Sequence, residues 1–210
     1  MTTATLRNLT VLAACLMAAR CSVLSPQPDR SRFYLLTPLP ESNAVQTASN
    51  PRLILGVGPV EFPDYLRRLP VVTRVEPHRL ELSDNKLWAE PLDKNFTGVL
   101  SENLATLLGT QRIEKYPWPL ATKVDYQVEV NVQRFETTSD GQAQLVASWI
   151  IRDGRSESIL YASKTAATAA AGADATSAST ALSGDLAILS KAIAKNVRAR
   201  SASLSNQVGT

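Results

Sequence analysis

The chain has 210 residues, of which 44% are hydrophobic and 20% are charged, and its mean hydropathy is −0.07. These values are typical of a globular protein and exclude a chain made mainly of membrane spans or of disordered sequence. The formal net charge of +3 includes Arg7 and Arg20 of the N-terminal leader, so the rest of the chain carries about +1, which argues against a nucleic-acid-binding protein.

An apolar stretch, residues 9–19, follows Arg7. Its eleven residues are too few for a bilayer core, which needs about 20, and they fit the apolar part of a secretory signal peptide. Both cysteines, Cys15 and Cys21, lie in or just after this stretch, so the rest of the chain can form no internal disulfide. A bacterial lipoprotein is cleaved and acylated at a cysteine in this place, so we expect residues 1–20 to be a lipoprotein signal peptide.

Two cysteines compete as the acylation site. Cys15 has the better cleavage signal but few apolar residues before it, whereas Cys21 follows the full apolar stretch and departs from the usual signal only at Arg20. We favour Cys21, because a Ser/Pro-rich segment follows it; residues 21–32 are then the acylated cysteine and a flexible tether. Ser22 resembles the signal for transfer to the outer membrane. A cleaved secretory signal with incidental cysteines is the alternative.

Residues 33–202 are expected to form one periplasmic domain, followed by a disordered tail at 203–210. Aromatic, aliphatic or alternating runs predict its extended segments, and Asp84-Asn85 is expected to be a hairpin turn. The extended segments are Phe33–Thr37, Arg52–Phe62, Val71–Arg74, Arg79–Ser83, Lys86–Ala89, Lys123–Gln133, Gln142–Arg152 and Ser158–Lys164.

Two helices complete the predicted domain. Pro91 begins a helix with one apolar stripe, and Gly109 ends it. The low-complexity segment 165–181 is expected to be a loop that runs into a second amphipathic helix, whose apolar residues are Leu182, Leu186, Leu189, Ile193 and Val197. The sequence therefore predicts an α+β fold, a mostly antiparallel sheet with two amphipathic helices packed on one face.

The residue types of catalytic and metal sites are scarce. His78 is the single histidine, so histidine-pair metal sites are excluded and a catalytic triad would depend on one loop residue. The segment 56–59 (GVGP) lacks the third glycine or the Lys-Ser/Thr of a phosphate loop, so we interpret it as a strand irregularity. We expect no enzyme activity, no metal and no cofactor, apart from covalent diacylglycerol and an N-linked acyl chain such as palmitate on the N-terminal cysteine.

Short motifs follow one another in a recognisable order along the domain. They are Arg32–Leu36, Phe62–Arg68, Val71–Arg74, Leu87–Leu92, Glu102–Ala105, Tyr116–Pro119, Asp125-Tyr126 and Arg134-Phe135. In this order they resemble the ABC-type transport auxiliary lipoproteins over nearly all of the mature chain. The resemblance implies a ring-forming homo-oligomer, anchored in the outer membrane, that partners an MCE-domain protein in lipid transport between the two membranes and so supports envelope integrity.

The segment Pro63–Arg74 is the expected contact surface for that partner. Its aromatic and guanidinium groups have the composition enriched at interfaces. The residues singled out are Tyr65, Leu66, Arg67, Arg68 and Arg74. The alternative is an ordinary loop whose Leu66 and Val72 fill the core. Two other functions stay open, a lipid carrier with an apolar groove and an assembly factor for a different outer-membrane complex.

Overall fold

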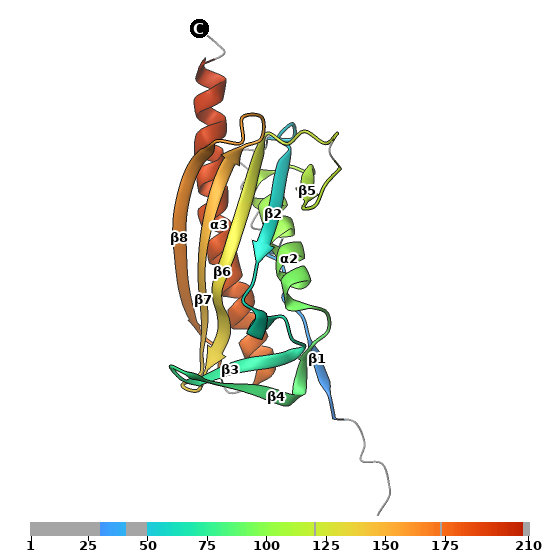
Figure 1. The fold of residues 1–210 in the computed structure, drawn as a ribbon, viewed down its shortest axis with the longest axis vertical. Helices are drawn as coiled ribbons and strands as arrows, with labels where there is room; N and C mark the ends of the chain where they lie inside the picture. Colours follow the sequence, from blue (N-terminus) through green and yellow to red (C-terminus); the bar gives the residue numbers. More distant parts are fainter. Residues whose placement is uncertain (1–29, 41–49, 120, 173, 208–210) are drawn as a thin grey trace, which may run out of the picture. The chain divides into compact units, whose positions relative to one another are not determined.

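The structure is a computed structural model, and it describes residues 30–40, 50–119, 121–172 and 174–207, with side chains of the last helix described up to residue 202. Runs of strands are separated by helices along the chain (Figure 1). They are β1 (Arg32–Tyr34), β2 (Leu55–Glu61), the 3-10 helix η3 (Asp64–Leu66), β3 (Pro70–Glu76), β4 (Arg79–Trp88), α2 (Leu92–Leu108), β5 (Ile113–Lys115), β6 (Tyr126–Thr138), β7 (Gln142–Asp153), β8 (Ile159–Ala170) and α3 (Ala175–Gln207).

Strand β6 is the centre of an eight-stranded sheet. On one side its first half pairs in parallel with β2 and its end pairs in parallel with β3. On the other side β7 and then β8 follow, each antiparallel to its neighbour. The β1–β4 and β2–β5 pairs are also parallel, whereas β3 and β4 are antiparallel. The α+β prediction is confirmed, and the sheet is mixed rather than purely antiparallel.

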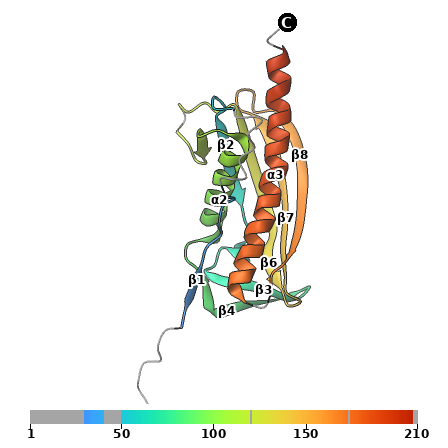
Figure 2. The same ribbon diagram turned by 180° about the vertical axis from the view of Figure 1, so that it is seen from behind.

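Both helices cover the same face of the sheet, as predicted (Figure 2). Helix α2 ends at Gly109, whose left-handed φ of 65° lets its N–H donate to the carbonyl of Ala105. Helix α3 begins after Asp174, whose Oδ1 accepts hydrogen bonds from the N–H groups of Thr176 and Ser177. Gly109 was readable from the sequence as a helix end, whereas the cap at Asp174 lies inside the segment that we predicted as a loop.

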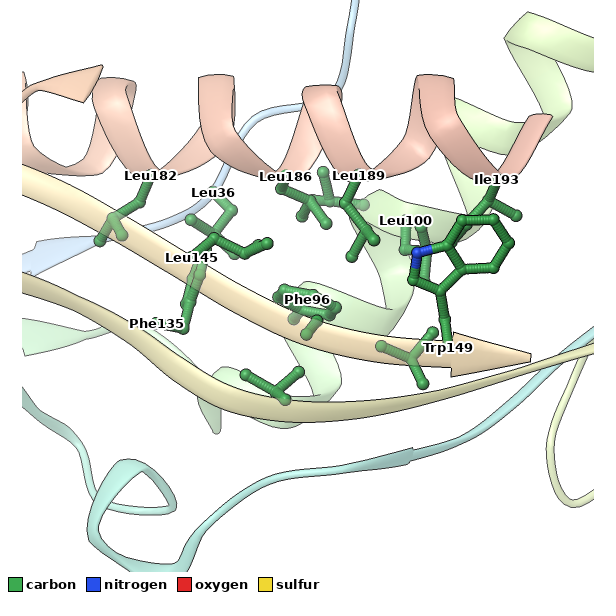
Figure 3. Packing of buried hydrophobic residues seen from close by; sticks show 14 of the residues in the cluster. Leu36, Phe96, Leu100, Phe135, Leu145, Trp149, Leu182, Leu186, Leu189 and Ile193 are labelled. Carbon is green, nitrogen blue, oxygen red and sulfur yellow. The ribbon is translucent and has the colours of Figure 1, made fainter. Parts of the chain in front are cut away.

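The core lies between this helical layer and the inner face of β6 and β7 (Figure 3). Alternate residues of β6 are buried from Tyr126 to Val132, which confirms the predicted alternation. The five apolar residues predicted for the second helix are all buried as well. Because burying a Leu, Ile or Phe side chain contributes about 1.5–3 kcal/mol, these contacts are the main stabilisation of the helices on the sheet.

The segment after β1 lies along the groove between the two helices, which cuts short the strand predicted for Phe33–Thr37. Its backbone N–H groups donate to polar side chains of both helices. These bonds run from Leu36 to Asn95 Oδ1 (2.7 Å), from Thr37 to Ser183 Oγ (3.0 Å) and from Leu39 to Asn103 Oδ1 (2.7 Å). Polar residues on the helices therefore replace the hydrogen bonds that a longer strand would make.

The predicted hairpin turn at Asp84-Asn85 is wrong, because both residues lie within the single strand β4. Val72 of β3 pairs with Leu82 and Pro70 pairs with Leu87, so five steps along β4 oppose two along β3. Strand β4 therefore bulges between Leu82 and Leu87. The turn that joins β3 to β4 lies at residues 77–78 instead.

The prediction for 165–181, a loop that runs into a helix, is wrong in its first part. Thr165 to Ala170 continue β8 in register with β7, and α3 begins at Ala175. Alanine, four of the six residues at 165–170, is depleted in strands, so pairing with β7 decides the conformation of this segment. Helix α3 then runs to Gln207, past residue 202, where we expected the domain to end and a tail to begin.

The irregularity predicted for residues 56–59 is confirmed by a register shift between Val57 and Val60. Two aromatic side chains explain its glycines. A Cβ on Gly56 would lie 2.6 Å from Trp118 Cη2, and one on Gly58 would lie 2.7 Å from Tyr116 Cβ. Because they have no side chain, the two glycines make room for Trp118 and Tyr116.

Candidate functional site

A buried charge cluster holds the predicted contact segment against the sheet. The carboxylate of Glu136, fully buried on β6, accepts hydrogen bonds from the Tyr65 hydroxyl (2.5 Å) and from Arg74 Nε (2.5 Å). Arg74 Nη1 also donates to the carbonyl of Pro77 (3.0 Å). Loss of one partner of a buried ion pair costs about 3–5 kcal/mol, so this cluster is a strong internal constraint on η3 and β3.

The same cluster keeps the Tyr65 phenol protonated. Burial and then the hydrogen bond and charge of Glu136 raise the pKa of Tyr65 to about 12. Tyr65 therefore donates to the carboxylate at any physiological pH. Tyr65 and Arg74 are thus engaged mainly with this chain's own β6, which the sequence could not indicate because Glu136 lies about 60–70 residues further along.

The other predicted contact residues divide between the core and the surface. Leu66 is 1% exposed and Val72 is also buried, as the ordinary-loop alternative expected. Arg67 and Arg68 are exposed. Arg67 lies 3.7 Å from Asp64 in an exposed ion pair, which contributes little to stability and leaves the guanidinium accessible. Of the five residues, only Arg67 and Arg68 are fully available to a partner.

Exposed apolar residues also occur at this end of the sheet. Leu69 is 47% exposed and directly precedes β3, and Phe33 of β1 is 62% exposed. Strand β4 lies between β1 and β3, and its Leu87 pairs with Phe33 on one side and with Pro70 on the other, so these elements form one end of the sheet (Figure 1). We call Phe33, Leu35, Arg67, Arg68 and Leu69, all of them exposed, the contact surface.

The sequence predicted only the arginines of this surface. Phe33 and Leu35 belong to an aromatic and aliphatic run that we interpreted as a strand, and Leu69 stands in a short loop. Large exposed apolar residues at one end of a domain are a feature of interaction surfaces. Their exposure depends on which strand each one borders, and no local pattern contains that information.

A cleft of about 810 Å³ lies between the β3–β4 hairpin and the first turn of α3. Hydroxyl and charged side chains contribute much of its lining, including Thr73, Glu81, Lys86, Ser139 and Asp174. A groove for an acyl chain is expected to be mainly apolar. This cleft therefore has a mixed lining rather than the mainly apolar one of an acyl-chain groove.

The described residues contain little that resembles a catalytic or metal centre. His78 lies at the β3–β4 turn with its side chain 85% exposed, and its Nε2 is 3.6 Å from Glu76 Oε2. Within the described ranges, no three His, Cys, Asp or Glu side chains gather closely enough to hold a metal ion. The helices of those ranges also include none that is long and apolar enough to cross a membrane. Cys15, Cys21, the signal peptide and nearly all of the tether lie outside the described residues.

Comparison with known proteins connects this fold with one family. Residues 34–194 match the model of the family described as ABC-type transport auxiliary lipoprotein component. The intermembrane transport lipoprotein PqiC of Escherichia coli K12 is 29% identical over 141 residues, which are 67% of this chain and 72% of PqiC. PqiC of Shigella flexneri matches equally well.

Solved structures share the fold. A crystal structure of an uncharacterized protein superposes with a TM-score of 0.65 at 22% identity, covering 80% of this chain and 98% of that one. Protein XCC0632 from Xanthomonas campestris superposes with a TM-score of 0.60 at 14% identity, covering 77% and 92%. The family match spans most of the chain, and the resemblance seen in the sequence motifs is confirmed. This protein belongs to the ABC-type transport auxiliary lipoprotein family.

Proposed function

We propose that this protein is an outer-membrane-anchored periplasmic lipoprotein that binds an MCE-domain protein in a lipid transport system between the two membranes. The observation that carries the proposal is the contact surface, because its exposed apolar and basic side chains stand at the end of the domain where the tether enters β1. In this proposal the chain is anchored in the outer membrane and binds its protein partner. The rest of the transport system moves the lipid, and this transport supports envelope integrity.

The anchor in this proposal is the acylated Cys21, with Cys15 as the alternative. Ten residues lie between Cys21 and Arg32, the first residue of β1, so the eleven steps from one Cα to the other span at most about 40 Å when fully extended. Ser22 favours the outer membrane as the destination. The domain is therefore held on the periplasmic side, within one tether length of the lipid surface.

The contact surface in this proposal is where the MCE-domain partner docks. Arg67 and Arg68 offer guanidinium groups for hydrogen bonds and ion pairs, and Phe33, Leu35 and Leu69 offer apolar area beside them. Interfaces of this kind combine an apolar centre with a polar rim. The Tyr65–Glu136–Arg74 cluster contributes indirectly, because it holds the arginines in place.

Site-specific photocrosslinking in whole cells tests the docking. We expect a photoreactive amino acid at Leu69 to capture the MCE-domain protein, and the double variant Arg67→Ala, Arg68→Ala to reduce capture about tenfold without loss of the folded protein. The same photoreactive group at Gln144, on the uncovered face of β7, is the matched control and should capture little. Capture of a β-barrel or a secretin would support the assembly-factor alternative instead, and capture of lipid alone would contradict docking at this surface.

Acyl labelling tests the anchor separately. Cells fed a labelled fatty acid should incorporate the label into the wild-type chain and into Cys15→Ala, but not into Cys21→Ala, because the thiol carries the lipid. Loss of label in Cys15→Ala alone would move the anchor to Cys15. Label that survives both substitutions together would overturn the lipoprotein anchor.

A further inference from the structure

The outer edge of β8 is long and unpaired. Strand β8 pairs with β7 on one side, and no other strand of the described ranges pairs with it. Its 12 residues include no proline, whereas the edge strands β1 and β5 have only 3 residues each. Proteins commonly shorten, charge or cover such edges, because unpaired N–H and C=O groups bind other strands. The edge of β8 therefore suits the addition of a strand from outside the sheet.

The register of the sheet shows which backbone groups of this edge are free. The N–H of Ala171 donates to the carbonyl of Gly141, in line with the register in which Gln142 pairs with Ala170. Hydrogen-bonded residues alternate along an antiparallel pair, so the odd-numbered residues from 163 to 169 face β7. The N–H and C=O groups that point away from β7, here called the free edge, belong to Ala162, Lys164, Ala166, Thr168 and Ala170, which are all exposed.

The side of the domain that carries the free edge is basic. No Asp or Glu occurs between residues 158 and 173 or after residue 185, whereas five cations lie in these two segments. They are Lys164, Lys191, Lys195, Arg198 and Arg200. Lys164, Lys191 and Lys195 are exposed, and the ion pairs found among the described residues include none of the three. Their positive charge is therefore available to a binding partner.

Helix α3 brings two of these lysines to the level of the third. It begins five residues after β8 ends and runs back beside that strand (Figure 2). The Cζ atom of Arg200 lies 4.3 Å from the ring centroid of Tyr161, near the start of β8. Lys164 is three residues further along the strand, a distance of about 10 Å, which equals about seven residues of helix. That level of α3 lies between Lys191 and Lys195, which are one turn apart.

We propose that an acidic, extended segment of another protein adds to the sheet as a strand along the free edge of β8. Its backbone pairs with the five free residues. The buried residues of β7 pair with the odd-numbered residues of β8, so Lys164 lies on the face that the helices leave uncovered. Alternate carboxylates of the added strand then lie beside Lys164 on that face, and residues between them lie on the face of α3 with its two lysines. The hydrogen bonds provide affinity, and the lysines select an acidic sequence.

Charge and length favour a different protein over a second copy of this chain as the occupant. A lysine on an edge strand disfavours pairing with another basic strand. A second copy would bring either its own β8, which has Lys164 and no carboxylate, or β1 or β5, which are too short to cover the edge. An acidic segment of another protein meets both requirements. This interaction uses neither the contact surface nor the anchor, so it can fail while the proposed function stands.

Amide hydrogen exchange of the full-length protein tests the addition of a strand. The probe is a synthetic peptide of about nine residues in which Glu alternates with Val, and the control peptide has Lys in place of Glu. We expect the amides of the even-numbered residues 162–170 to exchange at least about tenfold more slowly when the Glu peptide is bound, whereas the odd-numbered residues 163–169 exchange slowly throughout. Binding of the Glu peptide without this alternation would overturn strand addition. Equal binding of both peptides, or of neither, would overturn the proposed acidic partner.

Fluorescence anisotropy of the labelled Glu peptide separates charge from backbone pairing. Lys164→Glu should weaken binding about fivefold or more, because attraction across the strand pair becomes repulsion. Ala166→Pro removes an N–H that β7 does not use, so it should weaken binding at least about tenfold while the circular dichroism spectrum stays that of the wild type. Lys94→Glu, at an exposed position of α2, is the matched control and should change the affinity less than about twofold. Equal affinities of Lys164→Glu and Lys94→Glu would overturn the role of Lys164.

Two other occupants of the free edge give distinct results. Vesicles of phosphatidylglycerol that bind the wild type but not Lys164→Glu, together with no binding of the Glu peptide, would identify a lipid surface and overturn the proposal. A native mass of the wild type that falls when the Glu peptide binds would show that a second copy holds the edge, and would overturn a different protein as the occupant. Photocrosslinking at Leu69 tests the contact surface separately, so the two proposals can be judged apart.

Discussion

Asp185 is a buried carboxylate without a hydrogen-bond partner. It lies on α3 with no exposed surface, and neither of its oxygens accepts a hydrogen bond from a described residue. Burial raises the pKa of Asp185 from 3.8 to about 6. The folded chain therefore holds this proton more tightly than the unfolded chain, so the free energy of unfolding falls as the pH rises from about 4 to about 6. At neutral pH the charged form costs roughly 3 kcal/mol.

Replacement of Asp185 by asparagine removes the charge and keeps the shape. We expect Asp185→Asn to raise the free energy of unfolding at pH 8 by about 1–3 kcal/mol, because a buried amide costs less than a buried charge. The advantage should shrink towards pH 4, where the carboxyl is protonated. Urea unfolding at both pH values measures this difference. The exposed Asp84→Asn is the control, and a wild-type stability that does not fall between pH 4 and pH 7 would contradict the interpretation.

At the scale of elements, strand β2 owes its irregular path to aromatic side chains from the β5–β6 connection. Trp118 and Tyr116 pack edge to face with ring centroids 5.6 Å apart, over the backbone of β2. The glycines of β2 are therefore packing residues as well as the site of a register shift. A reader of the sequence sees two glycines in a strand, but the partner that requires them lies about 60 residues later.

Two Gly→Ala substitutions separate packing from conformational freedom. Gly56→Ala should lower the free energy of unfolding by about 1–3 kcal/mol, because its methyl group would overlap the Trp118 ring. Gly98→Ala, on α2 with nothing within 4 Å of the added carbon, should raise it by about 0.5–1 kcal/mol. Thermal unfolding of both variants measures the difference. Destabilisation of the same size in both would show that Trp118 is not the cause.

At the scale of the whole molecule, the two proposed surfaces lie on different parts of the sheet. The contact surface belongs to β1 and to the segment before β3, whereas the free edge belongs to β8, and β6 and β7 stand between β3 and β8. Docking of a partner on the first surface therefore leaves the backbone groups of the second available.

Much of this molecule follows from the sequence by itself. The alternation of β6 and the apolar stripes of both helices have periods of two and 3.6 residues, and Gly109 allows a left-handed helix end. Such signals are local, because each residue's neighbours along the chain set its direction. These local signals were sufficient to predict the α+β fold and to place Arg67 and Arg68 in the candidate site.

Only the tertiary structure decided the rest. Three features depend on residues that are far apart in the chain. They are the parallel strand pairs, the buried position of Leu66, and the ion pair of Arg74 with Glu136. The second half of β8 is rich in Ala, a residue depleted in strands, and it forms a strand through its pairing with β7. The physical reason is that pairing and burial depend on which segments meet in space, and local sequence does not carry that information.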